Sequence, residues 1–236
     1  MKQFETNNYI FYYDENSLAA KDIEKIACYQ EKCFKYICMV LKTKPTFKIH
    51  YFLCETPERV GEIYGDNEPC NGFASVPDKI YAVYNENIKC IGFHEDAHLI
   101  SYTINRPDNP FIRDGLAMYF DKDWWKINNY EWCKYYIKNG KFISLSDLLD
   151  KEYFFDNDCE LTYPIAGAFT DYIINLYGLD AYLNIYREND SKKALEDVLK
   201  ISVDELNFNF IAYVQSFKLD VQVEKRIKEL LENVYE

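Results

Sequence analysis

Five residues near the middle of the chain, His94-Glu95-Asp96-Ala97-His98, place two imidazoles and a carboxylate at a spacing that suits metal chemistry. On a helix, residues four apart lie on one face about 40° from each other, so His94 and His98 can bind the same ion. Imidazole nitrogens suit zinc, and Glu95 would lie beside the ion, placed to accept a proton from water bound to it. The pattern therefore predicts a zinc site that activates water.

A catalytic zinc ion needs a third protein ligand and keeps one position open for water. The third ligand must come from further along the chain. The metzincin pattern has a glycine three residues after the motif and a histidine, the third ligand, six residues after it. This chain has Ser101 and Ile104 at those two positions. That subclass is excluded, and a carboxylate from the following helix is the remaining route.

Residues 111–120, FIRDGLAMYF, closely resemble the W-x-x-E-G-L-A-x-Y segment of gluzincin-type metallopeptidases, in which the glutamate is the third zinc ligand. Asp114 stands at that position here. Residues 139–149 and 163–178 are similar to two further segments of the same family, and all three follow in the family's order. The resemblance implies a zinc-dependent metallopeptidase with one Zn²⁺ held by His94, His98 and Asp114, and with Glu95 as the general base.

The resemblance also implies a substrate and two further roles. Tyr163 is similar to the tyrosine that in related gluzincins donates a hydrogen bond to the developing oxyanion, although simple packing of the ring is the alternative. The substrate would be a peptide or protein that pairs with the edge strand near the active-site helix, and the candidate edge strand is 79–84. Neither endopeptidase nor exopeptidase action is predicted, and neither is the oligomeric state.

Asp114 is one methylene shorter than the family's glutamate, so its helix must approach the ion by about 1 Å more. Two other classes of function therefore stay open. One is a catalytically silent protein of the zincin fold that binds a peptide or a partner. The other is a metal hydrolase of a non-peptide amide, or a protease with one narrow target.

Other polar residues have more ordinary interpretations. Asp96 and Asp171 are candidates to orient a ligating imidazole by accepting a hydrogen bond from it. Histidine ligands usually donate their second N–H to a carboxylate or carbonyl in this way. Both are nevertheless expected on exposed helix surfaces. His50 lies on a predicted strand far from the motif and is expected to be structural.

Composition limits the remaining classes. The 236 residues include 48% hydrophobic and 28% charged types with only 8 Gly and 7 Pro, which is typical of a globular chain. The net charge of −12 lacks the basic surface that nucleic acid or an anionic membrane requires. No signal peptide or membrane-spanning stretch is recognised, which favours a cytoplasmic protein. The eight cysteines form no C-x-x-C pair and are expected to be reduced thiols.

The elements that must position the motif differ on its two sides. Before it, the pattern predicts strands at 8–13, 47–53, 73–74 and 79–84, a helix capped by Ser17 that runs to Leu41, and a short helix at 57–64. The motif helix is expected at 89–103, and Asn109 and Pro110 are typical of the start of the next helix. From there helices are predicted at 111–123, 129–138, 145–150, 163–177, 179–187, 191–199 and 203–234.

This order predicts an α+β protein with a zincin-like metalloprotease fold. Residues 1–105 would form a subdomain with a mixed β-sheet that includes the motif helix, and residues 106–236 a helical subdomain. The chain has no repeat and no flexible linker, so the two subdomains are expected to act together as one catalytic unit.

Overall fold

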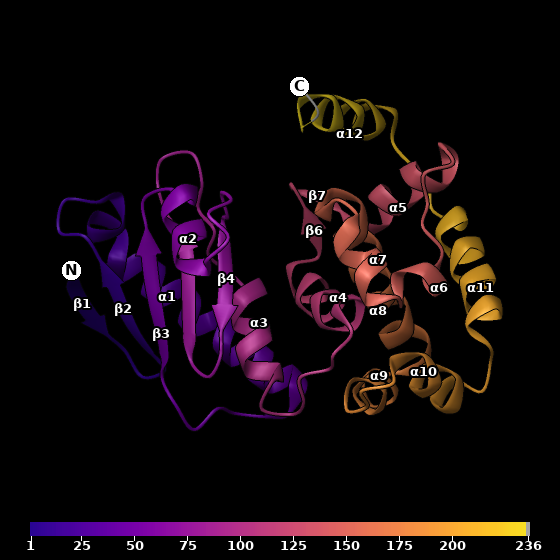
Figure 1. The fold of residues 1–236 in the computed structure, drawn as a ribbon, viewed down its shortest axis with the longest axis horizontal. Coiled ribbons are helices and arrows are strands. Elements are labelled where there is room, and N and C mark those ends of the chain that lie inside the picture. The colour runs from indigo at the N-terminus through magenta and orange to yellow at the C-terminus, as the bar shows by residue number, and fades with distance from the viewer. Residues whose placement is uncertain (235–236) are drawn as a thin grey trace. The chain divides into compact units, whose positions relative to one another are not determined.

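The helices and strands divide between two compact units, residues 1–104 and 105–236. The computed structural model describes residues 1–234 of the chain. The first unit contains a five-stranded mixed sheet with helices, whereas the second consists almost wholly of helices (Figure 1). The chain is therefore a mixed α and β protein, as predicted. Within the described residues, no helix is long and apolar enough to cross a membrane.

The sheet combines parallel and antiparallel pairing. Its strands follow the order β1 (Lys2–Glu5), β2 (Tyr9–Tyr13), β3 (Ile49–Cys54), β5 (Lys79–Val83) and β4 (Gly72–Ser75). The β2–β3 and β3–β5 pairs are parallel, and the two outer pairs are antiparallel. The predicted strands and the hairpin are confirmed, but the prediction that 79–84 is the edge strand is wrong. Because β5 pairs with β3, the hairpin leaves β4 at the edge.

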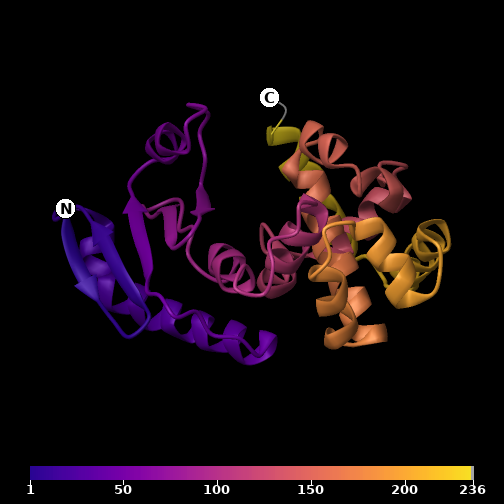
Figure 2. The same cartoon turned by 60° about the horizontal axis from the view of Figure 1, so that its bottom comes forward.

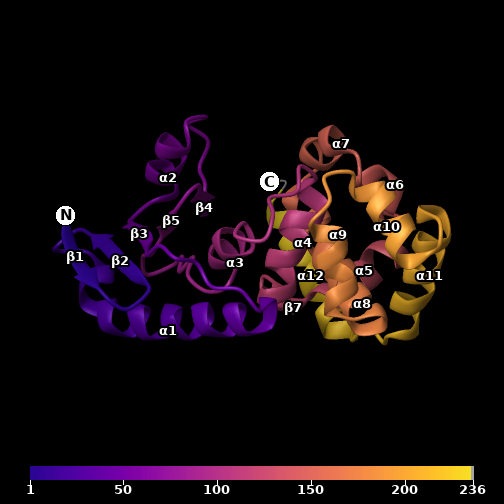
Figure 3. The same cartoon turned by 90° about the horizontal axis from the view of Figure 1, so that it is seen from below.

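Helix α1 (Leu18–Leu41) covers one face of this sheet. The Ser17 hydroxyl accepts a hydrogen bond from the backbone N–H of Ala20, which confirms the predicted cap. Figures 2 and 3 show α1 as one long helix beneath the strands, and α2 (Pro57–Tyr64) lies on the other side of them in Figure 3. The buried side chains that fill the space between α1 and the sheet include Tyr9, Phe11, Ile26, Phe34, Ile37, Tyr51 and Ile80.

Helix α3 carries the motif and spans His94–Ser101, so it is shorter than the predicted 89–103. The residues before it pair with the sheet instead. Lys89 forms a β-bridge with Tyr84, and the Cys90 N–H donates to the carbonyl of Val83 at 2.8 Å. Gly92 then takes a φ of 139°, a conformation that other residues rarely adopt, and turns the chain into the helix.

The second unit is built around a long helix, α8 (Cys159–Tyr177), which buries residues on all sides. The predicted helices are present, but the single helix at 203–234 is wrong. Phe217 leaves the helical conformation, and its ring stacks on Tyr130 at 4.8 Å, so the segment divides into α11 and α12. A small hairpin, β6 (Asp123–Trp124) and β7 (Ile127–Asn128), was not predicted. The other helices of this unit are α4 (Pro110–Asp121), α5 (Asn129–Lys138), α6 (Leu145–Leu148), α7 (Lys151–Asp156), α9 (Leu179–Tyr186), α10 (Ser191–Leu199), α11 (Val203–Ser216) and α12 (Val221–Val234).

A proline inside α8 leaves one helical hydrogen bond unmade, and a side chain from another helix replaces it. Pro164 has no N–H, so it cannot bond the carbonyl of Glu160 one turn earlier. The hydroxyl of Tyr136 in α5 donates to that carbonyl at 2.6 Å instead. The contact joins α5 to α8 where the helix would otherwise leave a carbonyl without a partner.

Candidate metal centre

The two histidines of the motif lie on one face of α3. Their ring centroids are 5.0 Å apart, and the ring planes cross at 79°. His98 is buried and His94 is half-buried. The hydroxyl of Tyr102, one turn after His98, lies 3.4 Å from His98 Nδ1. This contact at Nδ1 points to Nε2 as the nitrogen of His98 that would bind an ion.

Glu95 lies beside the first residue of the edge strand, and α3 is seen next to β4 in Figure 1. A Cβ atom placed on Gly72 would be 3.5 Å from Glu95 Oε1 and 2.9 Å from the sulfur of Cys90. The second distance is shorter than real Cβ contacts allow. Glycine at this position therefore lets the edge strand run close to the carboxylate of the predicted general base.

Asp114 is held in the first turns of α4, and its side chain is buried. The next residue, Gly115, allows α4 to approach α8 closely, because a Cβ there would lie 2.6 Å from Thr170 Oγ1 and 2.9 Å from the carbonyl oxygen of Ala166. The hydroxyl of Tyr182 donates to the carbonyl of Ile112 at 2.9 Å. Burial raises the pKa of Tyr182, and the nearby negative charge of Asp114 raises it further.

The three predicted ligands come together. His94, His98 and Asp114 each offer one ligand atom, and these atoms all lie within 4.8 Å of one another. A group of this kind could hold a metal ion. Two imidazoles with one carboxylate are a donor set of catalytic zinc, with a fourth position left for water. The residues therefore fit the predicted ion.

The sequence led us to expect Asp96 on an exposed surface. The structure instead shows it fully buried behind the motif. The hydroxyl of Tyr9 in β2 and Nε2 of Gln30 in α1 both donate to Asp96 Oδ2, the second at 3.1 Å. The prediction failed because an acidic residue is rarely buried without a charged partner. Burial raises the pKa of the Asp96 carboxyl well above its ordinary value, although both hydrogen bonds act in the opposite direction.

Tyr9 and Gln30 were not identified from the sequence as part of this environment. They are 87 and 66 residues away from Asp96, and pairings over such distances leave no local pattern. One signal was available for Gln30. It occupies a position in the apolar stripe of α1, between Ile26 and Phe34, where a polar side chain needs a buried partner.

The remaining candidates have separate partners. Asp171 is half-buried rather than exposed and accepts from Lys122 Nζ and the Tyr130 hydroxyl, both at 2.9 Å. His50 is structural, as predicted, because Nδ1 lies 2.8 Å from the Tyr12 hydroxyl. The half-buried ring of Tyr163 packs against Trp124 and Phe154, with centroids 5.5 and 6.2 Å away. Its predicted contact with an oxyanion stays a prediction.

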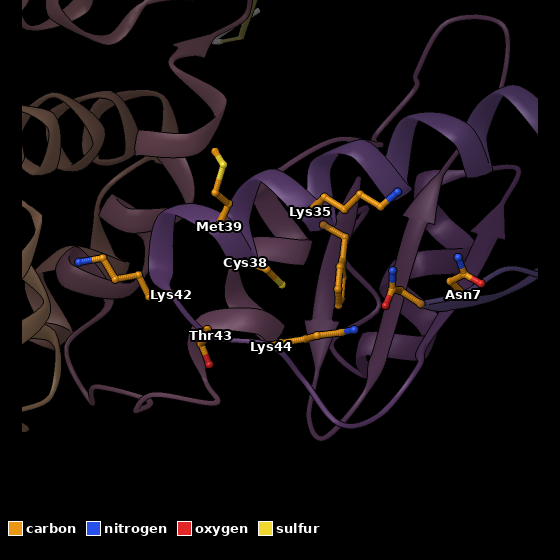
Figure 4. Close-up of a pocket in the computed structure, with 9 residues that line it drawn as sticks. Asn7, Lys35, Cys38, Met39, Lys42, Thr43 and Lys44 are labelled. Atoms are coloured by element: carbon orange, nitrogen blue, oxygen red, sulfur yellow. The ribbon is translucent and has the colours of Figure 1, made fainter.

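A hollow of about 700 Å³ lies at the C-terminal half of α1 (Figure 4). Lys44 reaches toward the side that Asn7 occupies, whereas Lys42 points away. The lining contains none of the predicted ligands and no carboxylate; it is formed by Asn7, Asn8, Phe34, Lys35, Cys38, Met39, Lys42, Thr43 and Lys44. This hollow is distinct from the candidate metal centre.

The chain matches no protein-family model and no curated protein. The resemblance to gluzincins therefore remains a prediction from the sequence motifs.

Proposed function

We propose that the protein is a zinc-dependent metallopeptidase of gluzincin type with a zincin-like fold. His94, His98 and Asp114 would hold one Zn²⁺, and Glu95 would act as the general base. The observation that carries the proposal is the grouping of these three ligand atoms within 4.8 Å. Glu95 follows the first ligand directly on the same two-turn helix, so any ion held there has a carboxylate beside it.

The chemistry divides between the ion and the side chains. A bound zinc ion would lower the pKa of water and polarise the carbonyl of the scissile bond. Glu95 would accept the proton that the attacking water loses and then deliver it to the leaving amine. Tyr163 would donate a hydrogen bond to the oxygen on which negative charge develops.

The edge strand supplies the argument for a peptide substrate. In the sheet order β4 lies outermost, so its outer edge is available for main-chain pairing with an extended chain. Gly72 at the start of β4 lies beside Glu95. A peptide that adds to this edge would therefore pass the general base in an extended conformation, which is the form in which one peptide bond can be presented to attacking water.

The test combines metal analysis with the Glu95→Gln variant. We expect wild type and variant, purified without chelator, to contain close to one equivalent of zinc, because glutamine leaves the three ligands in place. Hydrolysis of a broad peptide library should fall about 100-fold or more in the variant. Wild-type protein without zinc, or peptide hydrolysis that does not depend on Glu95, would sink the proposal.

A catalytically silent zincin-fold protein that binds a peptide or partner is the second candidate. The short carboxylate of Asp114 favours it, because a ligand that reaches the ion less well weakens the site. The same experiment separates the two candidates. Peptide binding without any Glu95-dependent hydrolysis would identify the silent protein.

A further inference from the structure

Asp96 lies on the side of α3 opposite the two histidines. At about 100° per residue, Asp96 is two residues from each histidine and is therefore separated from both by about 160° around the helix axis. Its carboxylate therefore cannot contact the imidazoles and faces α1 and the sheet instead. There it accepts hydrogen bonds from Tyr9 and Gln30.

Gln30 extends this connection to the start of the helix. Its Nε2 lies 3.1 Å from Asp96 Oδ2 and 3.1 Å from the carbonyl oxygen of Gly92, two residues before α3. The Tyr9 hydroxyl also lies 3.1 Å from the carbonyl oxygen of Gln30. One set of hydrogen bonds thus joins β2 and α1 to the first turn of α3 and to Gly92, two residues before that helix.

The hydrogen bonds to Asp96 and to the carbonyl of Gly92 are directional restraints at the start of helix α3. The helix has eight residues, and no side chain caps its N-terminus. Its buried Ala97, Leu99 and Ile100 hold it against the core, but apolar contacts are not directional and set the rotation about the helix axis only coarsely. Hydrogen bonds depend strongly on angle, so those to Asp96 can set that rotation.

A metal centre needs the rotation to be accurate. An imidazole nitrogen lies about 6 Å from the axis of its helix, so a rotation of about 5° moves it by about 0.5 Å. Bond lengths from zinc to nitrogen tolerate only about 0.2 Å. A small error in the placement of α3 would therefore displace both histidine ligands at once.

We propose that Asp96, held by Tyr9 and Gln30, is a positioning residue that sets the rotation of α3 about its axis and thereby places His94 and His98 for metal binding. The proposal rests on the proposed metal centre. Stability alone does not account for this arrangement, because apolar side chains of similar size in place of all the hydrogen-bonded partners are often equally stable or more so.

The experiment measures metal binding and stability separately in full-length Asp96→Leu and Asp96→Asn. Zinc affinity is measured by competition with a chromophoric chelator, ligand geometry by the visible absorption of the Co²⁺-loaded protein, and stability by urea unfolding without metal. We expect Asp96→Leu to lower zinc affinity 10- to 100-fold. It should also change the Co²⁺ spectrum. Metal-free stability should fall only modestly, because Tyr9 and Gln30 lose one acceptor, and the protein should stay folded.

Asp96→Asn serves as the conservative variant. Its amide oxygen can still accept from Gln30 and Tyr9, so it should restore most of the zinc affinity and a wild-type Co²⁺ spectrum. Tyr9→Phe removes one donor and keeps the ring, so it should give an intermediate affinity. This third variant keeps the proposal testable if Asp96→Leu does not fold.

Three results would overturn the proposal. Unchanged zinc affinity and an unchanged Co²⁺ spectrum in folded Asp96→Leu and Tyr9→Phe would show that the network does not position the ligands. If Asp96→Leu and Asp96→Asn lost zinc affinity equally, and each loss matched a loss of metal-free stability, the role of Asp96 would be purely structural. Wild-type protein that binds neither Zn²⁺ nor Co²⁺ would remove the proposed metal centre itself, which distinguishes that failure from the first two.

Discussion

At the scale of single residues, the proposed metal centre depends on whether the short carboxylate of Asp114 reaches the ion. The carboxylate lies in the first turns of α4, and the helix is held against α8 where Gly115 leaves no room for movement toward Thr170. A fixed backbone gives the carboxylate a fixed reach. Under the proposed function, we therefore expect the shorter side chain to suit this position of α4 better than glutamate would.

The first prediction follows from this fixed reach. Asp114→Glu should lower zinc affinity by about tenfold, because the extra methylene carries the carboxylate past its position, and Asp114→Ala should lower it further. Competition with a chelator measures both. Asp121→Glu, the same change at the other aspartate of α4, should leave affinity unchanged. Tighter zinc binding by Asp114→Glu would show that the shorter ligand weakens the site.

Tyr163 provides the second prediction. Removal of its hydroxyl in Tyr163→Phe keeps the ring packed on Trp124 and Phe154, so stability should change little. Loss of a hydrogen bond to the oxyanion should lower kcat about 100-fold and leave KM and zinc content unchanged. Tyr172→Phe on the same helix is the control. Unchanged kcat in Tyr163→Phe would establish that the ring only packs.

At the scale of elements, the close crossing of α4 and α8 holds Asp114, the proposed third ligand. Two glycines, one on each helix, make this crossing possible. A Cβ on Gly167 would lie 2.7 Å from Met118 Cβ and 2.4 Å from Asn129 Nδ2, and Gly115 is equally tight against Thr170. Side chains at either position would push the helices apart.

The third prediction tests this crossing. Gly115→Ala should destabilise the protein by about 1–3 kcal/mol despite the better helix propensity of alanine, because its Cβ meets the backbone of Ala166. Zinc affinity should fall as well, since Asp114 is the adjacent residue. Urea unfolding and chelator competition measure the two effects. A variant as stable as wild type with unchanged affinity would contradict the tight crossing.

The elements themselves were largely predictable, because they depend on local chemistry. Ser17 capped α1 as expected, and Pro110 begins α4. What could not be predicted depends on pairing between distant segments. The choice of β4 as the edge strand depends on which strand pairs with β3, and the burial of Asp96 depends on partners in β2 and α1. The grouping of His94, His98 and Asp114 was predictable because spacing on a helix and resemblance to a short motif are both local.

At the scale of the whole molecule, buried thiols make stability depend on alkaline pH. None of the eight cysteines, all of which lie within the described residues, forms a disulfide. Burial raises the pKa of Cys38 from 9.0 to about 11. The positive charge of Lys44 lowers this pKa and the negative charge of Asp96 raises it, both by smaller amounts than burial. Burial also raises the pKa of Cys133. The folded state therefore keeps protons that the unfolded chain releases above pH 9.

The fourth prediction follows from the sign of this difference. Stability from a raised thiol pKa is complete below about pH 9 and is lost as pH rises toward the folded value, by at most about 1.4 kcal/mol per pH unit for each group. Urea unfolding between pH 8 and pH 11 measures the loss. The slope should be shallower in Cys133→Ala, which removes one such group. An equal slope in both proteins would show that Cys133 does not contribute.

Metal binding links the candidate centre to the stability of the entire chain, because the unfolded chain does not bring His94, His98 and Asp114 together. We expect zinc at about 100 times its Kd to raise the free energy of unfolding by about 2.7 kcal/mol, and chelation to reverse the gain. The measurement is urea unfolding at a series of buffered zinc concentrations. The dependence on concentration matters more than the size of the effect, because only binding to the folded state produces a logarithmic increase.

The third histidine gives this prediction its control. His50 is bonded to Tyr12 and is remote in sequence from the ligands, so His50→Ala should lower the baseline stability and keep the full gain from zinc. His98→Ala should abolish the gain, because it removes a ligand and leaves fewer than the three that a zinc centre needs. A gain from zinc that survives in His98→Ala but disappears in His50→Ala would place the stabilising ion on the sheet rather than on α3. In that case the motif would be occupied too weakly to support catalysis.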